Sequence, residues 1–288
     1  MGRVADSTIK GFMYQFNRTL NEILSSSDEV ITVEGIVEDI DKVSGENITA
    51  IQCKYHAEVE KFQWSKVYKP ILQMIKTYTE QKDSHIIFIL YAFFPSEQAG
   101  ERNVPKNEIL KALKTKNIEY ICDYIAYIKK IEDTEIKELI SKTRKNKDDK
   151  AKIKKYIDTN ELEVLCDLDE FINNRFRFII GQEYDELEKE NKQMLLKVGF
   201  SSVDIEEIIF PNAIHCIASV SILKDASDRS ITKQELLNEL RTIKHTAISR
   251  WTKELSNYKK LLSIRRKQMA KKLNSNATKN IFILINQN

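Results

Sequence analysis

Apolar residues near the start of the chain recur every three or four positions, which is the spacing of a helix with one buried face. The row runs from Ile9 to Leu24 and shortly follows an Asp-Ser pair, residue types that cap helices. Gln15 and Glu22, seven residues apart, stack on one flank of this row. We therefore predict an amphipathic helix that carries two polar side chains beside its buried face.

β-branched residues then predominate, and the period changes to that of strands. VITVEGIVEDIDKV and ITAIQCKY flank the turn SGEN, which predicts a hairpin. With this turn, or the tighter GE within it, the facing pairs are Val43–Ile48, Asp41–Ala50 and Asp39–Gln52. Because side chains alternate between the faces of a sheet, one surface would collect Asp39, Asp41, Gln52, Lys54 and His56.

The next elements complete an α/β core. Apolar spacing predicts a helix over residues 64–78, which Pro70 must kink or restart. HIIFILYAFF, residues 85–94, is an unbroken apolar run of strand length, typical of a strand buried on both faces. The order helix, hairpin, helix and buried strand predicts an α/β domain over residues 1–100.

The remainder, residues 101–288, has long helical periods separated by charge-rich stretches and is predicted to be mostly α-helical. Thr232 and Glu235 have the spacing of a capping box, which predicts a helix start there. The chain closes on a strand-like run, so a strand at 281–286 is a further prediction. We expect this region to serve assembly or regulation.

Composition narrows the class of protein. A chain of 288 residues with 42% apolar residues can bury a proper core. No signal segment and no apolar run of about 20 residues occur, so a soluble, cytoplasmic protein without a membrane partner is expected. The four cysteines lie far apart and are expected to be reduced core residues. No glycine-rich phosphate loop occurs, so any ATP dependence would come from a partner.

The shared surface of the hairpin has the chemistry of metal-assisted phosphodiester hydrolysis. Carboxylate and amide oxygens suit Mg²⁺ or Mn²⁺, and an ammonium group can orient or deprotonate water and offset charge on the phosphate. We predict that Asp39, Gln52 and the main-chain carbonyl of Cys53 hold the metal. Lys54 is the predicted catalytic lysine.

Several assignments stay open at this site. Gln15 or Glu22, from the first helix, would order a metal-bound water. The stretch EDID offers three carboxylates, so Asp41 or Glu38 could take the role of Asp39. An acidic hairpin with a nearby lysine is also a common solvated surface, so the spacing alone does not establish catalysis.

Four stretches, GFMYQF, EDID, IQCKYH and IIFILYAFF, together resemble the PD-(D/E)XK nuclease core of the Mrr restriction-endonuclease group. They are more similar still to the double-strand DNase domains of bacterial antiphage effectors, namely those associated with cyclic-oligonucleotide synthases (CD-NTases) and the nuclease subunit of Lamassu systems. The resemblance covers roughly residues 1–95. It matches Asp39 to the acidic ligand, Gln52 to the E/Q position, Lys54 to the catalytic lysine and Gln15 to the E/Q of the first helix.

The chain departs from this pattern in two ways. No proline precedes the acidic residue, and glutamine replaces glutamate at residue 52. The second change removes one negative charge, so metal affinity should depend more on the remaining carboxylates.

The resemblance implies a restriction-endonuclease-like fold and Mg²⁺-dependent hydrolysis of double-stranded DNA with low sequence specificity, in an antiphage or anti-plasmid defence system. Because one site cuts one strand, a homo-oligomer, dimer or tetramer, is expected in the active state. The implied partners are an SMC-like ATPase and a small accessory subunit. The alternative is a non-catalytic nucleic-acid-binding or adaptor module of a defence complex.

Further basic residues are candidates for DNA contacts. The stretch KKLLSIRRKQMAKKL predicts a basic helix whose Arg265, Arg266 and Lys267 could bind phosphates. A solvated face or a partner-docking helix would have the same composition. His56 shares the face of Lys54 and could touch phosphate, although an exposed strand-end histidine would have the same spacing.

Overall fold

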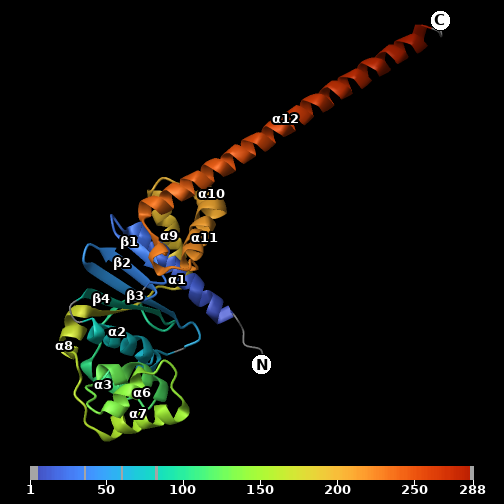
Figure 1. Ribbon diagram of the computed structural model, residues 1–288. Coiled ribbons are helices and arrows are strands. Elements are labelled where there is room, and N and C mark those ends of the chain that lie inside the picture. Colours follow the sequence, from blue (N-terminus) through green and yellow to red (C-terminus); the bar gives the residue numbers. More distant parts are fainter. Residues whose placement is uncertain (1–5, 36, 60, 82–83, 286–288) are drawn as a thin grey trace. The chain divides into compact units, whose positions relative to one another are not determined.

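The structure of the chain, a computed structural model, describes residues 6–35, 37–59, 61–81 and 84–285. The chain divides into two compact units, Met1–Leu236 and Leu237–Asn288. The first unit is a sheet with helices on both faces, and the second is the greater part of one long helix (Figure 1).

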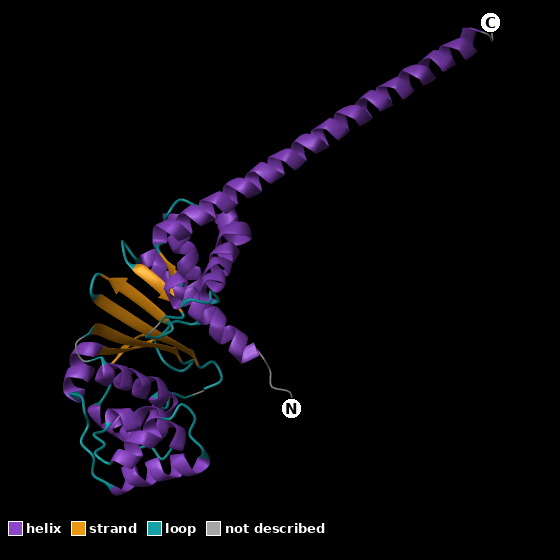
Figure 2. Ribbon diagram, in the orientation of Figure 1, coloured by secondary structure: helices purple, strands orange, loops and turns teal. Residues whose placement is uncertain are grey.

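A mixed seven-stranded sheet forms the centre of the first unit (Figure 2), with the strand order β5-β6-β4-β3-β2-β1-β7. Its strands are β1 (Val30–Val33), β2 (Ile40–Ser44), β3 (Asn47–Tyr55), β4 (His85–Phe93), β5 (Gly100–Arg102), β6 (Phe176–Ile180) and β7 (Ser230–Ile231). The fold is therefore α/β, as predicted. β6 and β7 come from the region predicted to be mostly helical, so the boundary predicted near residue 100 does not separate two compact units.

Helices cover both faces of the sheet (Figure 1). One layer holds α1 (Asp6–Ser25), α9 (Tyr184–Lys197), α10 (Ser202–Asp204) and α11 (Phe210–Ser221). The other holds α2 (Tyr68–Glu80), α3 (Lys106–Leu113), α6 (Thr134–Ser141), α7 (Lys147–Thr159) and α8 (Leu168–Glu170). Shorter helical turns are η1 (Trp64–Lys66), α4 (Ile118–Tyr120), η2 (Ile121–Ile125), α5 (Ala126–Ile128), η3 (Phe171–Arg175), η4 (Ile205–Ile209) and η5 (Ala226–Asp228).

The predicted hairpin forms with the predicted register. Val43 pairs with Ile48, and Asp41 pairs with Ala50. The turn is the tighter of the two alternatives. Ser44 pairs with Asn47, so only Gly45 and Glu46 lie between the strands. Gly45 has a φ of 61°, a left-handed conformation that glycine adopts without strain.

The helix and the buried strand that follow also agree with the sequence. η1 precedes α2, and Pro70 lies in the first turn of α2, where its missing N–H is not needed. The proline therefore marks a restart. β4 pairs in parallel with β3 on one side and with β6 on the other, and its side chains from Phe88 to Phe93 are buried. This strand is an interior strand of the sheet, next to β3, the middle strand of the seven.

Side-chain alternation gives the two faces of β3 different neighbours. Ala50 of β3 and Leu90 of β4 belong to the same buried apolar cluster as Ile71 of α2. On the opposite face, Tyr14 of α1 lies over Tyr55, with 4.8 Å between the ring centroids. Gln52 and Lys54, which alternate with Tyr55, therefore share the face of α2, whereas α1 covers the other face.

A buried amide network joins α1 to α9. Asn21 Nδ2 donates to Asn191 Oδ1 at 3.1 Å, and Asn191 Nδ2 donates to the main-chain oxygen of Asn17 at 2.8 Å. Asn17 and Asn191 are fully buried, so these bonds satisfy groups that water cannot reach. The later part of the chain thus holds α1 against the sheet.

The long helix α12 (Lys233–Ile285) begins at the predicted capping box. The Thr232 N–H donates to the Glu235 carboxylate at 2.8 Å, and the Glu235 N–H donates to Thr232 Oγ1 at 3.2 Å. Residues 281–285 continue this helix and do not form the predicted strand; residue 286 lies outside the described residues. A lone strand would leave its main-chain groups without partners, whereas a helix pairs them internally.

Candidate active site at the open end of the hairpin

The pairing of β2 with β3 stops where the predicted site begins. The ladder runs from the turn to the pair Ile40–Ile51. Two residues beyond Ile51, the Cys53 N–H donates to the side-chain atom Asp39 Oδ2 at 2.8 Å. β3 meanwhile stays paired with β4 as far as Tyr55–Phe93. The predicted Asp39–Gln52 pair is thus not a ladder pair, and a carboxylate side chain occupies the point where the two strands part.

Asp39 and Lys54 are neighbours at this point. Lys54 Nζ lies 3.9 Å from Asp39 Oδ2, and the two side chains are 36% and 21% exposed. Burial raises the pKa of Asp39 above its ordinary value, although Lys54 and the Cys53 N–H act in the opposite direction. The predicted acidic residue and the predicted catalytic lysine are therefore brought together and remain accessible.

Two further side chains place unpaired oxygens in the buried part of the site. Neither carboxylate oxygen of Glu38 has a hydrogen-bond partner among the described residues, and neither does Gln52 Oε1. Glu38 and Gln52 are 5% and 6% exposed. Burial, helped by the negative charge of Asp39 and opposed by Lys54, raises the pKa of Glu38 to about 8. Buried oxygens without donors are the groups that a bound cation would satisfy.

Asp41 has a different role from the one that the sequence left open. Its two carboxylate oxygens accept the main-chain N–H groups of Val37 at 2.9 Å and of Glu38 at 3.1 Å. Gly35 lies against this carboxylate so closely that a Cβ there would overlap it. Asp41 thus shapes the loop that carries Glu38 and Asp39 to the start of β2.

The polar residues of α1 are paired away from Gln52. Gln15 Nε2 donates to Glu34 Oε1 at 2.8 Å, and Glu22 forms an ion pair with Arg18. Since α1 covers the opposite face of β3, Gln15 and Glu22 do not join Gln52 and Lys54 on one face. Glu34, the partner of Gln15, contributes its negative charge to the raised pKa of Asp39.

Arg18 of α1 is a partly buried basic residue that the apolar spacing of the sequence did not single out. Its guanidinium carbon lies 4.3 Å from the centre of the Tyr91 ring, on the face of the sheet that α1 covers. The side chain is 17% exposed. The signal was its position four residues before Glu22, which places both side chains on one face of a helix.

His56 is half-buried and stacks on Phe94, with 4.7 Å between the ring centroids. It is therefore not the exposed strand-end histidine considered from the sequence. Burial, with the positive charges of Lys54 and Lys66, lowers the pKa of His56. A neutral ring is consequently favoured there. Arg265, Arg266 and Lys267 are exposed on the part of α12 that belongs to the second unit.

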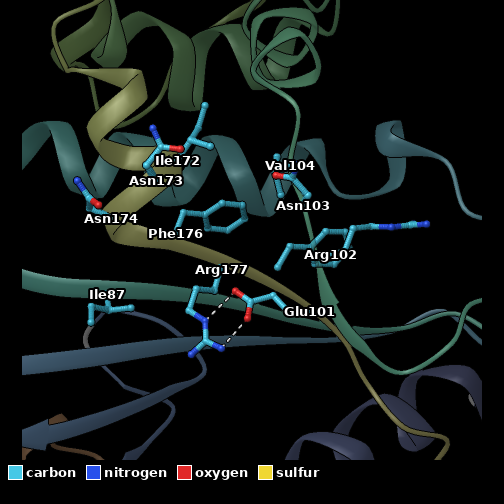
Figure 3. A pocket seen from close by; sticks show the side chains of 11 residues that line it. Ile87, Glu101, Arg102, Asn103, Val104, Ile172, Asn173, Asn174, Phe176 and Arg177 are labelled. Atoms are coloured by element: carbon cyan, nitrogen blue, oxygen red, sulfur yellow. Dashed lines mark hydrogen bonds and ion pairs between the residues drawn. The ribbon is translucent and has the colours of Figure 1, made fainter.

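A cavity of about 560 Å³ lies elsewhere in the first unit, beside β5 and β6. Figure 3 shows Glu101 and Arg177 pointing toward each other across it, with hydrogen bonds of 2.9 and 2.8 Å. Their charges offset one another, and none of the predicted site residues lines this cavity. The cavity is thus separate from the open end of the hairpin.

The donor set at the hairpin fits a hard divalent cation in type, although it is poor in carboxylates. Within the described ranges, no group of three or more histidine, cysteine, aspartate and glutamate side chains is placed to hold a metal. Glu38, Asp39 and Gln52 supply two carboxylates and one amide oxygen, which are ligands of the kind that Mg²⁺ takes. The three unpaired oxygens of Glu38 and Gln52 carry this fit.

None of the helices in the described ranges is long and apolar enough to cross a membrane. Protein-family models, curated proteins and solved structures offer no match to this chain.

Proposed function

We propose that the chain is a metal-dependent DNA endonuclease with a PD-(D/E)XK type of core. The observation that carries this proposal is the parting of β2 and β3 at Asp39, beside Gln52 and Lys54 on one face of β3. The element order from α1 to β4 agrees with the restriction-endonuclease-like core that the sequence resembles. Double-stranded DNA is the proposed substrate, cut with low sequence specificity.

The metal would be held by Glu38, Asp39 and Gln52, with Mg²⁺ or Mn²⁺ as the ion. The main-chain carbonyl of Cys53 is the further proposed ligand. When bound, the ion would polarise the scissile phosphate and lower the pKa of a bound water. Glu38 thereby joins Asp39 as a carboxylate ligand, which offsets the charge lost by having glutamine at residue 52.

Lys54 is the residue proposed to act on the reacting groups. Its ammonium group is partly exposed and lies 3.9 Å from Asp39 Oδ2, and its positive charge acts against the raised pKa of Glu38. There it can orient the attacking water and offset negative charge that builds on the phosphate. Gln52 lies two residues before Lys54 on the same face of β3, and its backbone is held there because β3 is paired with β4 over its whole length.

Cleavage of supercoiled plasmid DNA tests this assignment. The purified chain is incubated with Mg²⁺, Mn²⁺ or EDTA beside Lys54→Ala and Asp39→Asn. The matched control is Lys42→Ala, because Lys42 lies on the neighbouring strand and pairs with Glu29, away from the site. We expect both site variants to lose cleavage by about a hundredfold or more, whereas the control keeps it.

The possible outcomes are distinct. Metal-dependent cutting lost in Lys54→Ala and kept in Lys42→Ala supports the site. Equal cutting by all variants would place the activity elsewhere, in another site or in a contaminant. If no chain cuts, the same comparison is repeated with the proposed partners present.

Assembly belongs to the same proposal. A single site cuts one strand, so a homo-oligomer, dimer or tetramer, would make double-strand breaks. The proposed setting is an antiphage or anti-plasmid defence system. The proposed partners are an SMC-like ATPase and an accessory subunit, in keeping with a sequence that has no phosphate-binding loop of its own.

A second candidate is a non-catalytic nucleic-acid-binding or adaptor module with the same fold. The small number of carboxylates at the site favours it, because Gln52 stands where a third would contribute. Such a module would bind DNA with equal affinity in Mg²⁺ and in EDTA. The nuclease should bind more tightly with a divalent ion present.

A further inference from the structure

An exposed apolar row follows α12 through the second unit. Its members are Trp251, Leu255, Tyr258, Leu262 and Met269, which are between 43% and 67% exposed. Large apolar side chains at this exposure are unusual when they are contiguous. We name these five residues the α12 seam.

The spacing of the seam is that of a coiled coil. Successive members are four, three, four and seven residues apart, and Arg265 fills the one missing position. Apolar residues that repeat every three and four positions form a straight line only when the helix winds around another helix. The pattern therefore indicates a helical partner. DNA, whose backbone is recognised by clustered positive charge, needs no such line.

Charge is strongly segregated along the chain. Residues 237–288 hold 12 basic and 2 acidic residues, a net charge of +10. Residues 1–236 hold 34 basic and 41 acidic residues, a net charge of −7. The near-neutral total of +3 hides this division.

The charge decides which kind of helix can cover the seam. Lys259 and Arg266 flank it, and Arg265 lies within it. In a pair of identical parallel helices Arg265 would face its own copy, and two copies of residues 237–288, each with a net charge of +10, would repel each other. An acidic helix would instead pair its carboxylates with these side chains.

We propose that the α12 seam docks an acidic amphipathic helix of a partner protein. The partner helix carries apolar residues at three- and four-residue spacing and glutamate or aspartate beside them. The apolar seam supplies affinity, and the flanking charges select the partner and the orientation. This surface is separate from the proposed nuclease site and does not depend on it.

Fluorescence of Trp251 reports the docking directly. The chain has two tryptophans, so in the full-length Trp64→Phe chain Trp251 is the only one. The probe is a designed helical peptide with leucine along its seam and glutamate on both flanks. The control peptide has lysine at the flanking positions. We expect a blue shift of the emission with the glutamate peptide and affinity roughly tenfold or more above that for the lysine peptide.

Two matched variants separate a seam from a merely apolar helix. Leu262 belongs to the seam and Ile264 does not, and both are exposed, at 43% and 53%. Leu262→Ser should weaken binding of the glutamate peptide by roughly tenfold, and Ile264→Ser should leave it unchanged. Circular dichroism establishes that both variants keep the same helix content.

Three results would overturn the proposal. One is binding of both peptides with equal affinity, or of neither. Another is an equal effect of Leu262→Ser and Ile264→Ser. The third is sedimentation equilibrium that shows the wild-type chain to self-associate through Leu262 while the peptide does not bind, since the occupant would then be a second copy. All three readouts are independent of DNA cleavage.

Discussion

The two ends of the β2–β3 hairpin are built in opposite ways. At the turn end, Val43 and Ile48 pair in a regular ladder, and a two-residue turn closes the strands. At the open end, the ladder stops after Ile40–Ile51 and a side chain takes the place of a main-chain partner. Within a few residues, regular pairing changes to a buried group of carboxylate and amide oxygens without donors.

This difference indicates that the proposed site lowers the stability of the fold. A ladder pair satisfies its donors and acceptors, whereas the unpaired oxygens of Glu38 and Gln52 have lost water without gaining a partner among the described residues. The fold tolerates this because β3 is held by β4 along its other edge. Substitutions that remove these unpaired oxygens should therefore raise the stability of the fold and lower the proposed activity.

The largest effect on stability is expected where the ladder ends. Ile51 is 1% exposed, and Ile51→Ala should lower the free energy of unfolding by about 3 kcal/mol, because it leaves a cavity in a packed sheet. Urea denaturation measures the change. The control, Ile48→Ala near the turn, should cost less because Ile48 is only partly buried. Equal losses would mean that the two ends are packed alike.

Substitution of Asp41 should cause the next largest loss of unfolding free energy. Asp41→Ala removes the acceptor of two main-chain N–H groups and should cost about 2 kcal/mol of unfolding free energy. Asp41→Asn keeps one acceptor oxygen and should cost less. If Asp41→Ala proves as stable as the wild type and yet loses cleavage like Lys54→Ala, Asp41 acts as a ligand and the loop-shaping role is refuted.

Substitution of Glu38 should change the free energy of unfolding in the opposite direction and raise it. Glu38→Met replaces a buried carboxyl without donors by an apolar side chain of similar length, so the free energy of unfolding should rise by about 1 kcal/mol. The measurement is made in EDTA, with the exposed turn variant Glu46→Met as the control. The same Glu38 variant should lose metal-dependent cleavage. A loss of stability would show that the carboxyl has a partner in solution.

The smallest effect is expected at Glu235, a carboxylate with its donors in place. The Thr232 N–H, and then the Thr232 hydroxyl, lower the pKa of Glu235 below its ordinary value near 4.5. A lowered folded-state pKa means that the stabilisation is present above the ordinary value and is lost as the pH falls through the folded-state value.

Glu235→Gln should therefore cost about 0.3 kcal/mol at neutral pH, because the cap is exposed and screened by solvent. Thermal unfolding of the variant and of the wild type measures this difference, which should vanish in acid. A difference that persists in acid would point to geometry of the amide rather than to the charge.

The sequence predicts the regular parts of this protein well. Side-chain alternation alone places Gln52 and Lys54 on one face of β3, because the period of two follows from covalent geometry. The turn residues determine the register of the hairpin in the same way. The capping box at Thr232 is likewise local chemistry.

Tertiary structure decided the remainder. The departure of β2 from β3 depends on the fold of the loop around Asp41, and no period in the sequence reports it. The face that α1 covers, and hence the pairing of Gln15 with Glu34, depends on the buried contact of α1 with α9, which comes from residues about 170 positions away. The final apolar run shows the same limit, because its length fits a strand or a helix and it continues α12.

By itself, then, the sequence determined which side chains share a strand face or a helix face, because those periods are properties of the backbone. Only the tertiary structure decided which faces meet and which oxygens lose their donors. The reason is that each segment could pair with many distant segments. Which pairing forms depends on the packing of the whole fold, and a local stretch of sequence does not specify it.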